Sequence, residues 1–310
     1  MTKMEPITVQ NLTKSYGSKE AVKGISFEVD HGELFGLIGP DGAGKTTIFR
    51  ILTTLLTPDS GDTRVLDFDV VGDYRKIRPK VGYMPGRFSL YQDLSVKENL
   101  SFFASVFGTT VDANYDLIKP IYSQLEPFEN RMAGALSGGM KQKLALCCAL
   151  IHKPKVLFLD EPTTGVDAVS RKEFWQMLHQ LKKEEITILV STPYMDEAEQ
   201  CDRIALIQEG KIMSIDTPEQ ITSRFDRNLW AVKSRDKYSL IQTLRDYEFA
   251  ESVQPFGEYV HYTDQRPDVT ADVIEEYLDS RQVADLEIKK IQPDIEDTFM
   301  RLMNQEVGHE

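Results

Sequence analysis

The pattern of hydrophobic and polar positions along this chain predicts a mixed α/β protein built around a mainly parallel sheet. Largely apolar runs, typical of strands buried on both faces, occur at Leu34–Ile38, Val156–Leu159 and Ile186–Val190. Segments with helical periodicity follow two of these runs, at Thr46–Leu56 and Ser170–Lys183. Sheets of this kind bind ligands at the carboxyl ends of their strands.

Stretches that alternate polar and apolar residues predict antiparallel strands beside this core. Ile7–Leu12 and Ala21–Val29 predict a small amino-terminal sheet, with Tyr16 in the loop between them. Ile204–Ile207 and Lys211–Ile215 predict a later hairpin. We therefore expect an antiparallel β subdomain next to the parallel sheet.

The middle of the chain, about residues 88–150, is predicted to form a helical subdomain. Ser95 and the glutamate three residues later have the spacing of a capping box, so we expect a helix over Val96–Phe107. The segment that follows is predicted as two helical pieces broken at Pro120 and Pro127. A further helix, which runs to Ile151, completes the subdomain.

Charge is distributed unevenly and indicates a second domain. The chain carries a net charge of −13, and residues 226–310 contribute −9 of it, with 19 acidic and 10 basic side chains. Strand-like and helix-like segments there follow the order β-α-β-β-α-β, ending in a helix at Asp294–Met303, which predicts a small α+β sandwich. We expect a core domain over residues 5–225 and a carboxy-terminal domain over residues 226–305. The acidic balance also argues against nucleic acid as a partner.

The most informative stretch has the spacing of a phosphate-binding loop between a strand and a helix. Its residues are Gly39, Pro40, Asp41, Gly42, Ala43, Gly44, Lys45, Thr46 and Thr47. Glycines let backbone N–H groups approach a polyphosphate, and the helix amino terminus favours the same anion. Lys45 is predicted to reach the β- and γ-phosphates, and the Thr46 hydroxyl to hold Mg²⁺.

Other candidate residues lie elsewhere in the chain. The strand at Val156–Leu159 leads into Asp160, a candidate Mg²⁺ ligand, and Glu161, a candidate to polarise an attacking water. Ser137, Gly138 and Gly139 predict a capped, sterically open helix start and a second anion site. An exposed aromatic ring at Tyr16 could stack on an adenine.

Neither the cysteines nor the apolar runs indicate secretion or a membrane span. Cys147, Cys148 and Cys201 are odd in number and irregularly spaced, which fits a reducing compartment. No apolar run reaches the length of a transmembrane helix, and the first residues lack a signal-peptide core. If the protein acts at a membrane, we expect a partner to supply the span.

Together these motifs resemble the ATP-binding subunit of ABC transporters, over residues 6–225. The resemblance identifies Leu136–Met140 as the signature motif, Glu161 as the catalytic carboxylate, Gly165–Asp167 as a dimer-contact loop and Tyr16 as the adenine-stacking residue. It implies that two subunits close head-to-tail on ATP and that the segment from Phe88 drives a membrane permease. It places the chain in the cytoplasm, at the inner face of the membrane.

The carboxy-terminal segment resembles drug-exporter ATPases of the daunorubicin-resistance type. There such a domain adds dimer contacts or regulation; a stabilising appendage is the alternative. Two positions depart from the family: Gly86 stands where Gln is usual, and Pro193 where His is usual. Asp41, where Asn is common, is a milder departure.

These departures predict MgATP binding with weak hydrolysis by this chain alone, and pairing with itself or with a second, complete ATPase subunit. Two other classes stay open: a regulatory module that uses ATP only to hold a dimer, and an ABC-type protein that is not linked to transport.

Overall fold

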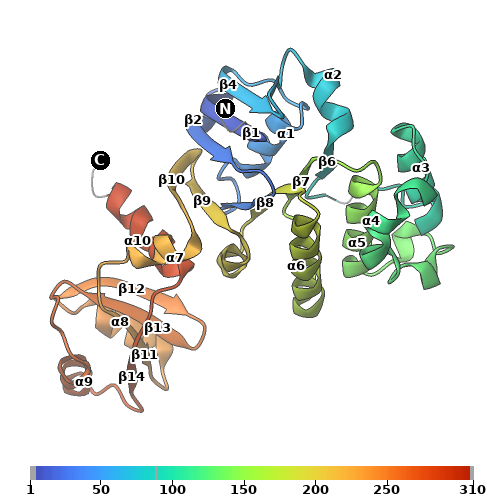
Figure 1. Ribbon diagram of the computed structural model, residues 1–310. Helices are drawn as coiled ribbons and strands as arrows, with labels where there is room; N and C mark the ends of the chain where they lie inside the picture. Colours follow the sequence, from blue (N-terminus) through green and yellow to red (C-terminus); the bar gives the residue numbers. More distant parts are fainter. Residues whose placement is uncertain (1–4, 88, 308–310) are drawn as a thin grey trace. The chain divides into compact units, whose positions relative to one another are not determined.

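The computed structural model describes residues 5–87 and 89–307, so the predicted start of the helical subdomain at Phe88 lies outside the described residues. The chain forms two compact units that divide between Pro218 and Glu219 (Figure 1). This division precedes the expected boundary at residues 225 and 226, because helix α7 (Pro218–Ser223) belongs almost entirely to the second unit. Each unit has its own hydrophobic core.

The first unit is built on a six-stranded sheet that is mainly parallel, as predicted. In spatial order its strands are β10 (Lys211–Asp216), β9 (Arg203–Gln208), β3 (Leu34–Ile38), β8 (Thr187–Thr192), β7 (Val156–Asp160) and β6 (Val81–Met84). Only β10 pairs antiparallel, through the predicted hairpin. Every residue of β3, β7 and β8 is buried, which explains why these strands are largely apolar.

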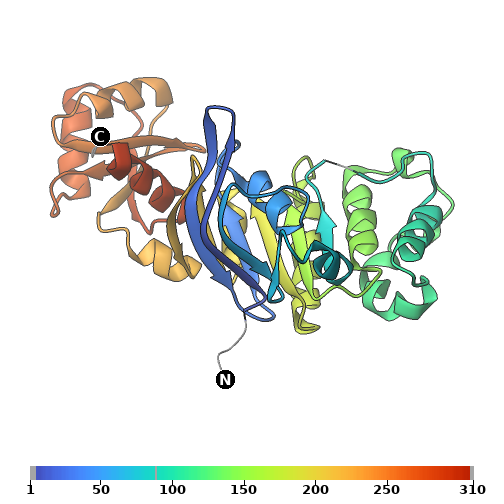
Figure 2. The ribbon, with the colours of Figure 1, turned by 90° about the horizontal axis from the view of Figure 1, so that it is seen from above.

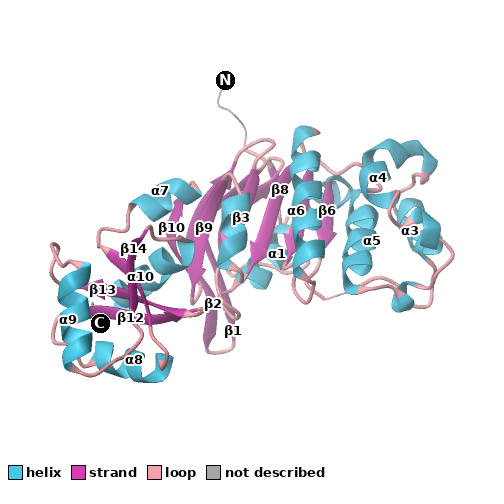
Figure 3. Cartoon of the chain, turned by 90° about the horizontal axis from the view of Figure 1, so that it is seen from below, coloured by secondary structure: helices cyan, strands magenta, loops and turns pink. Residues whose placement is uncertain are grey.

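Helices α1 (Lys45–Leu52) and α6 (Ala168–Lys183) lie along this sheet (Figure 3). Phe49 of α1 meets Phe158 of β7 edge to face, with ring centroids 6.2 Å apart, so the helix that follows the phosphate loop is fixed to the strand that carries the carboxylates. α1 is shorter than predicted, because Thr53 already ends it with turn geometry.

The predicted antiparallel β subdomain is a four-stranded sheet in the order β2 (Lys19–Val29), β1 (Ile7–Tyr16), β4 (Ser60–Val65) and β5 (Phe68–Asp69). β1 extends through Tyr16, which was expected in a loop. The pairing with β2 continues past register shifts that begin next to Asn11, whose φ of 50° is left-handed. Tyr16 is therefore held at the end of a strand.

Helices gather at one end of the first unit (Figure 2). They are α3 (Val96–Val106), α4 (Tyr115–Tyr122) and α5 (Gly138–Leu150), with short 3-10 turns at Asp112–Asn114, Glu126–Phe128 and Ala133–Ala135. The Ser95 capping box is present. Pro120 lies inside α4, so the predicted break there is wrong: burial of Ile118 and Ile121 holds the helix despite the missing N–H.

The remaining short elements of the first unit are α2 (Tyr74–Ile77) and 3-10 turns at Arg78–Lys80 and Met195–Gln200.

The second unit has the predicted β-α-β-β-α-β order. Its elements are β11 (Leu229–Lys233), α8 (Lys237–Arg245), β12 (Ala250–Phe256), β13 (Tyr259–Asp264), α9 (Ala271–Ser280), β14 (Glu287–Ile291) and α10 (Ile295–Val307). The strands form one antiparallel sheet in the order β12-β13-β11-β14. The first and last strands of the repeat are therefore neighbours, the arrangement of a split β-α-β sandwich.

Candidate functional site

The phosphate loop connects β3 to α1 and buries the Lys45 ammonium group. The Lys45 side chain is 2% exposed, and its Nζ lies 3.1 Å from Glu161 Oε1. Nζ also donates hydrogen bonds to the carbonyl oxygens of Gly39, at 2.7 Å, and Pro40, at 3.0 Å. Three oxygens thus meet the three N–H donors of the ammonium group, and phosphate oxygens could replace any of them.

Gly44, directly before Lys45, cannot be replaced by a residue with a side chain without strain. Its φ is +108°, and a Cβ at this position would lie 2.5 Å from the carbonyl oxygen of Ala21. The loop is also held by a hydrogen bond from the Gly210 N–H to the Ala43 carbonyl, at 2.9 Å. Two distant segments therefore hold the loop in place.

Asp160 ends β7 and accepts two hydroxyl hydrogen bonds. Its Oδ1 accepts from Ser191 Oγ at 2.7 Å and from Thr46 Oγ1 at 3.3 Å. Burial raises the pKa of Asp160, and the two hydroxyl donors partly oppose that rise. The structure thus brings together Thr46 and Asp160, the two residues predicted to hold Mg²⁺.

Glu161 follows in a left-handed backbone conformation, with φ of 50°. Its N–H donates to Ser191, to the carbonyl at 3.1 Å and to Oγ at 3.0 Å. Backbone conformations of this kind are sparsely populated and concentrate at functional sites. Here the backbone turns after β7 and the carboxylate reaches Lys45.

A cavity of about 250 Å³ lies at this loop. It is lined by Tyr16, Lys19, Ala21, Gly42, Gly44, Lys45, Thr46, Thr47 and Glu161. The sequence analysis singled out all of these except Lys19 and Ala21, which come from β2. Tyr16 is 47% exposed, so its ring is available for stacking.

The other predicted residues of the loop, Gly39, Pro40, Asp41 and Ala43, do not line the cavity. Asp41 is exposed, so its carboxylate does not crowd the anion site.

Ser137, Gly138 and Gly139 do not line this cavity either. Ser137 caps α5 by accepting the Met140 N–H at 3.3 Å, as predicted. Ser137 and Gly138 are both exposed. Within one chain the structure does not bring this helix start into the phosphate cavity. Asp167 of the predicted dimer-contact loop caps α6.

Ser191 is the residue that sequence reasoning missed. It is fully buried at the end of β8, next to β7, and its hydroxyl bridges Asp160 and the backbone of Glu161. Its place at the carboxyl end of a buried strand was the available signal. Glu197 has a similar linking role, because its Oε2 accepts from Thr163 at 3.0 Å and from Thr192 at 2.6 Å.

The two positions that depart from the family pattern lie beside this site. Gly86 lies two residues after the end of β6. A Cβ at this position would be 3.0 Å from the Asp160 carbonyl oxygen, so Gly86 lies next to the residues that carry the two carboxylates. Pro193 follows β8 two residues after Ser191 and is half-buried. Neither residue has a side-chain hydrogen-bonding group.

Comparison with known proteins places the chain in a family. The profile of the family described as ABC transporter matches residues 22–164. A Nod factor export ATP-binding protein I from Burkholderia pseudomallei (strain 1710b) is 36% identical over 307 residues, covering 97% of this chain and 98% of that protein. The chain therefore belongs to the ABC transporter ATP-binding proteins, and nucleotide binding is a property of this domain.

A probable multidrug ABC transporter ATP-binding protein, YbhF of Escherichia coli (strain K12), is 46% identical over 220 residues, or 70% of this chain. The chain spans only 38% of the length of that relative. Among solved structures, cbiO1 from Clostridium perfringens, part of the ABC transporter complex cbiONQ, aligns with 71% of this chain and 91% of its own. Its TM-score is 0.63 at 27% identity. These matches confirm the predicted P-loop ATPase fold.

Proposed function

We propose that this chain binds MgATP and uses its hydrolysis to energise a membrane exporter. The observation that carries the proposal is the convergence of Lys45, Thr46, Asp160 and Glu161 beyond β3 and β7, which flank β8 in one parallel arrangement. An exporter, rather than an ABC-type protein outside transport, is favoured by the names of the relatives, which describe multidrug and Nod factor export.

The residues present fit Mg²⁺ bound with ATP. The Thr46 hydroxyl and the Asp160 carboxylate face one another 3.3 Å apart, and hard oxygen ligands of this kind suit Mg²⁺. When bound, the ion neutralises charge on the β- and γ-phosphates. Lys45 would bind the phosphates, Tyr16 would stack on the adenine, and Glu161 would accept the proton of the attacking water.

The site is complete only in a dimer. Ser137, Gly138 and Gly139 form a second helix start suited to an anion, at which Ser137 and Gly138 are exposed, and it does not reach the phosphate cavity of its own chain. A head-to-tail partner would supply it. Gly86 and Pro193 lack the side chains expected near the γ-phosphate, so we infer that a homodimer hydrolyses ATP weakly and that a complete second ATPase subunit raises turnover.

Light scattering and ATPase assays on the purified chain test this. Glu161→Gln is expected to convert monomers to dimers in MgATP but not in ADP, and Lys45→Ala is the matched control that stays monomeric.

The double substitution Gly86→Gln with Pro193→His is expected to raise ATP turnover at least tenfold. That gain is no larger than the rate enhancement that a positioned proton-transfer group usually provides. Robust homodimer turnover that depends on Glu161 would contradict the weak-site proposal. Dimers that form in ATP while Glu161→Gln leaves turnover unchanged would favour a regulatory module instead.

A groove in the first unit is suited to a permease. It has a volume of about 430 Å³ and is lined largely by apolar side chains from β6, α3 and α5, among them Tyr83, Phe103, Phe107 and Ala149. No helix among the described residues is long and apolar enough to cross a membrane. We infer that a membrane permease docks here, which would hold the chain at the cytoplasmic face of the membrane.

Co-purification with membranes from the native host tests the docking groove. Phe103→Asp is expected to abolish membrane association and to leave nucleotide binding unchanged. Val273→Asp, at a position 37% exposed in the other unit, is the control and should have no effect. Equal membrane association of both variants would overturn the proposed groove, while the nucleotide assays above would be unaffected.

The role of the second unit is open between dimerisation or regulation and simple stabilisation. Its split β-α-β fold does not fix a function by itself.

A further inference from the structure

The two faces of the carboxy-terminal sheet differ in chemistry. One face presents Trp230, Val232, Val253, Val260 and Tyr262, which form an apolar core with α8 and α9. Because side chains alternate between faces, the residues between them point the other way, toward α10. A polar face covered by a helix is unfavourable unless its groups find partners.

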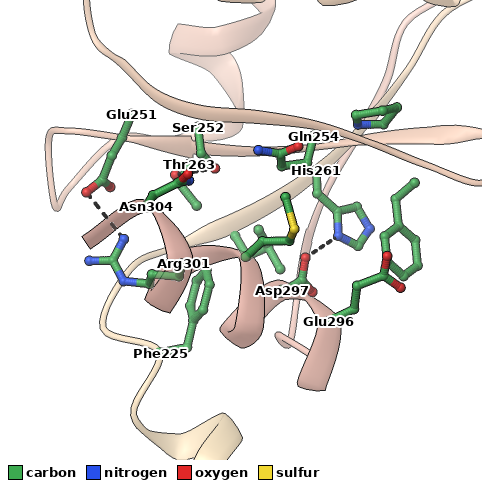
Figure 4. Close-up of a pocket in the computed structure, with 14 residues that line it drawn as sticks. Phe225, Glu251, Ser252, Gln254, His261, Thr263, Glu296, Asp297, Arg301 and Asn304 are labelled. Atoms are coloured by element: carbon green, nitrogen blue, oxygen red, sulfur yellow. Dashed lines mark hydrogen bonds and ion pairs between the residues drawn. The ribbon is translucent and has the colours of Figure 1, made fainter. Parts of the chain in front are cut away.

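That second face carries Ser252 and Gln254 of β12 and His261 and Thr263 of β13. A cavity of about 410 Å³ lies between these side chains and α10 (Figure 4). Its volume is in the range of sites for small organic molecules. The apolar part of its lining consists of Phe225, Leu229, Pro255, Phe256 and Met300.

The imidazole ring of His261 lines this cavity and is held in a defined orientation. Its side chain is 9% exposed, and its Nδ1 lies 2.6 Å from Asp297 Oδ1 (Figure 4). An ionised carboxylate can only accept, so Nδ1 donates to Asp297, and in the neutral form of the imidazole Nε2 is then an acceptor. Phe256 stacks on the ring at a centroid distance of 4.2 Å and fixes its orientation. Among the described residues, Nε2 has no hydrogen-bond partner.

The charge around the cavity favours a cation. The lining carries three carboxylates, from Glu251, Glu296 and Asp297, and one guanidinium, from Arg301. That guanidinium is already paired, with Glu251 at 3.3 Å and Asp226 at 2.5 Å. Glu251 adds little net charge, because it is also paired with Arg227 at 2.9 Å. A bare metal ion is not favoured, because no group of three His, Cys, Asp or Glu side chains within the described residues could hold one.

We propose that this cavity binds a small organic cation, an ammonium group on an apolar body. The ammonium donates to His261 Nε2 and lies beside Asp297 and Glu296. The apolar body packs against Phe256 and Met300. This assignment concerns a site separate from the nucleotide cavity and does not depend on ATP hydrolysis.

Binding of three probes of one shape to the full chain tests the proposal. Benzylammonium, benzyl alcohol and benzoate differ in charge but little in size. By isothermal titration calorimetry at pH 8, benzylammonium is expected to bind at least tenfold more tightly than the other two. His261→Gln should reduce that affinity at least tenfold, and Glu296→Gln, at an exposed position, severalfold. His31→Gln, an exposed histidine of the other unit, is the matched control and should have no effect.

Thermal melting of each variant distinguishes lost binding from lost folding, and Glu296→Gln keeps the test valid should His261→Gln unfold the domain. Benzoate binding as tightly as benzylammonium would overturn the proposal. So would the absence of benzylammonium binding, or unchanged binding in both variants.

Discussion

The nucleotide cavity and the carboxy-terminal cavity both place charged groups beside buried strands, but they are built differently. Around Lys45 most contacts are made by backbone carbonyls and by residues at the carboxyl ends of parallel strands. Around His261 they are made by side chains on one face of an antiparallel sheet, closed by a helix. In the first site local chain geometry shapes the phosphate loop, and distant strands supply the carboxylates and the Gly210 contact. In the second site no part is preformed, because every group comes from packed strands and a helix.

This difference has a consequence for substitutions. In the nucleotide cavity the polar side chains are linked to one another by hydrogen bonds and an ion pair, so removal of one should change the positions of several others. In the carboxy-terminal cavity single changes should act locally. Four predictions follow this contrast, from the largest effect to the smallest.

Lys45→Ala is expected to lower ATP affinity and turnover by at least about 100-fold, because it removes a buried charge that contacts three oxygens. Binding of a fluorescent ATP analogue and phosphate release measure the two effects. Lys19→Ala, at the exposed rim of the same cavity, is the control and should change affinity far less. A comparable loss of ATP affinity in both variants would mean that ATP binding depends on the total positive charge near the cavity rather than on the buried Lys45 contacts.

Ser191→Ala is expected to raise the Mg²⁺ concentration for half-maximal turnover roughly 10- to 100-fold, the usual range when a group that orients a metal ligand is lost. Metal-free nucleotide binding should be unchanged, because the Ser191 hydroxyl hydrogen-bonds to the Asp160 carboxylate and the Glu161 N–H and does not line the nucleotide cavity. Ser191→Thr keeps the hydroxyl and should restore most of the Mg²⁺ response. Failure of Thr to rescue would indicate a packing role instead of a positioning one.

Asp294→Asn tests how the stability of the second unit depends on pH. Asp294 does not line the carboxy-terminal cavity, but it is hydrogen-bonded to Asp297, which does. Burial, together with the neighbouring Asp297 carboxylate, raises the pKa of Asp294 from 3.8 to about 6. The unfolded chain loses this proton first, so the free energy of unfolding should fall as pH rises from 3.8 to about 6, and stay lower above that.

Asn at position 294 should remove this fall in the free energy of unfolding. Its side-chain oxygen can still accept the hydrogen bond that the Asp297 N–H donates to Asp294 Oδ1 at 2.8 Å. The gain above pH 6 should be less than about 3 kcal/mol, the equivalent of two pKa units. Hydrogen exchange of α10 amides between pH 4 and 8 measures it, with Asp268→Asn as an exposed control. A fall in protection with Asn would refute the electrostatic explanation.

Asp41→Asn should have the smallest effect, a change in ATP affinity of less than about fivefold, because exposed charges interact weakly through solvent. Titration of ATP at low and high salt measures it. A large gain confined to low salt would show that the Asp41 carboxylate acts on the phosphates after all.

The sequence alone predicted those parts of the fold and site whose backbone geometry is set by the spacing of nearby residues. The strand, glycine loop and helix around Lys45 could be predicted because the motif itself sets backbone approach, and the parallel strands because both faces are buried. Tyr16 and Pro120 were misplaced because pairing with β2 and packing of α4 override local preference. Ser191 and the His261 cavity require knowledge of which strands are neighbours and which face a helix covers.

The contact between Gly210 and Ala43 bears on how the protein is made. Gly210 donates to the Ala43 carbonyl, and its own carbonyl accepts the Lys23 N–H at 2.8 Å. During translation the phosphate loop leaves the ribosome long before the turn that holds it, by on the order of ten seconds at synthesis rates of about 5–20 residues per second. A growing chain should therefore be unable to retain ATP until the β9–β10 turn has emerged, which couples the first ligand-binding event to near-completion of the first unit.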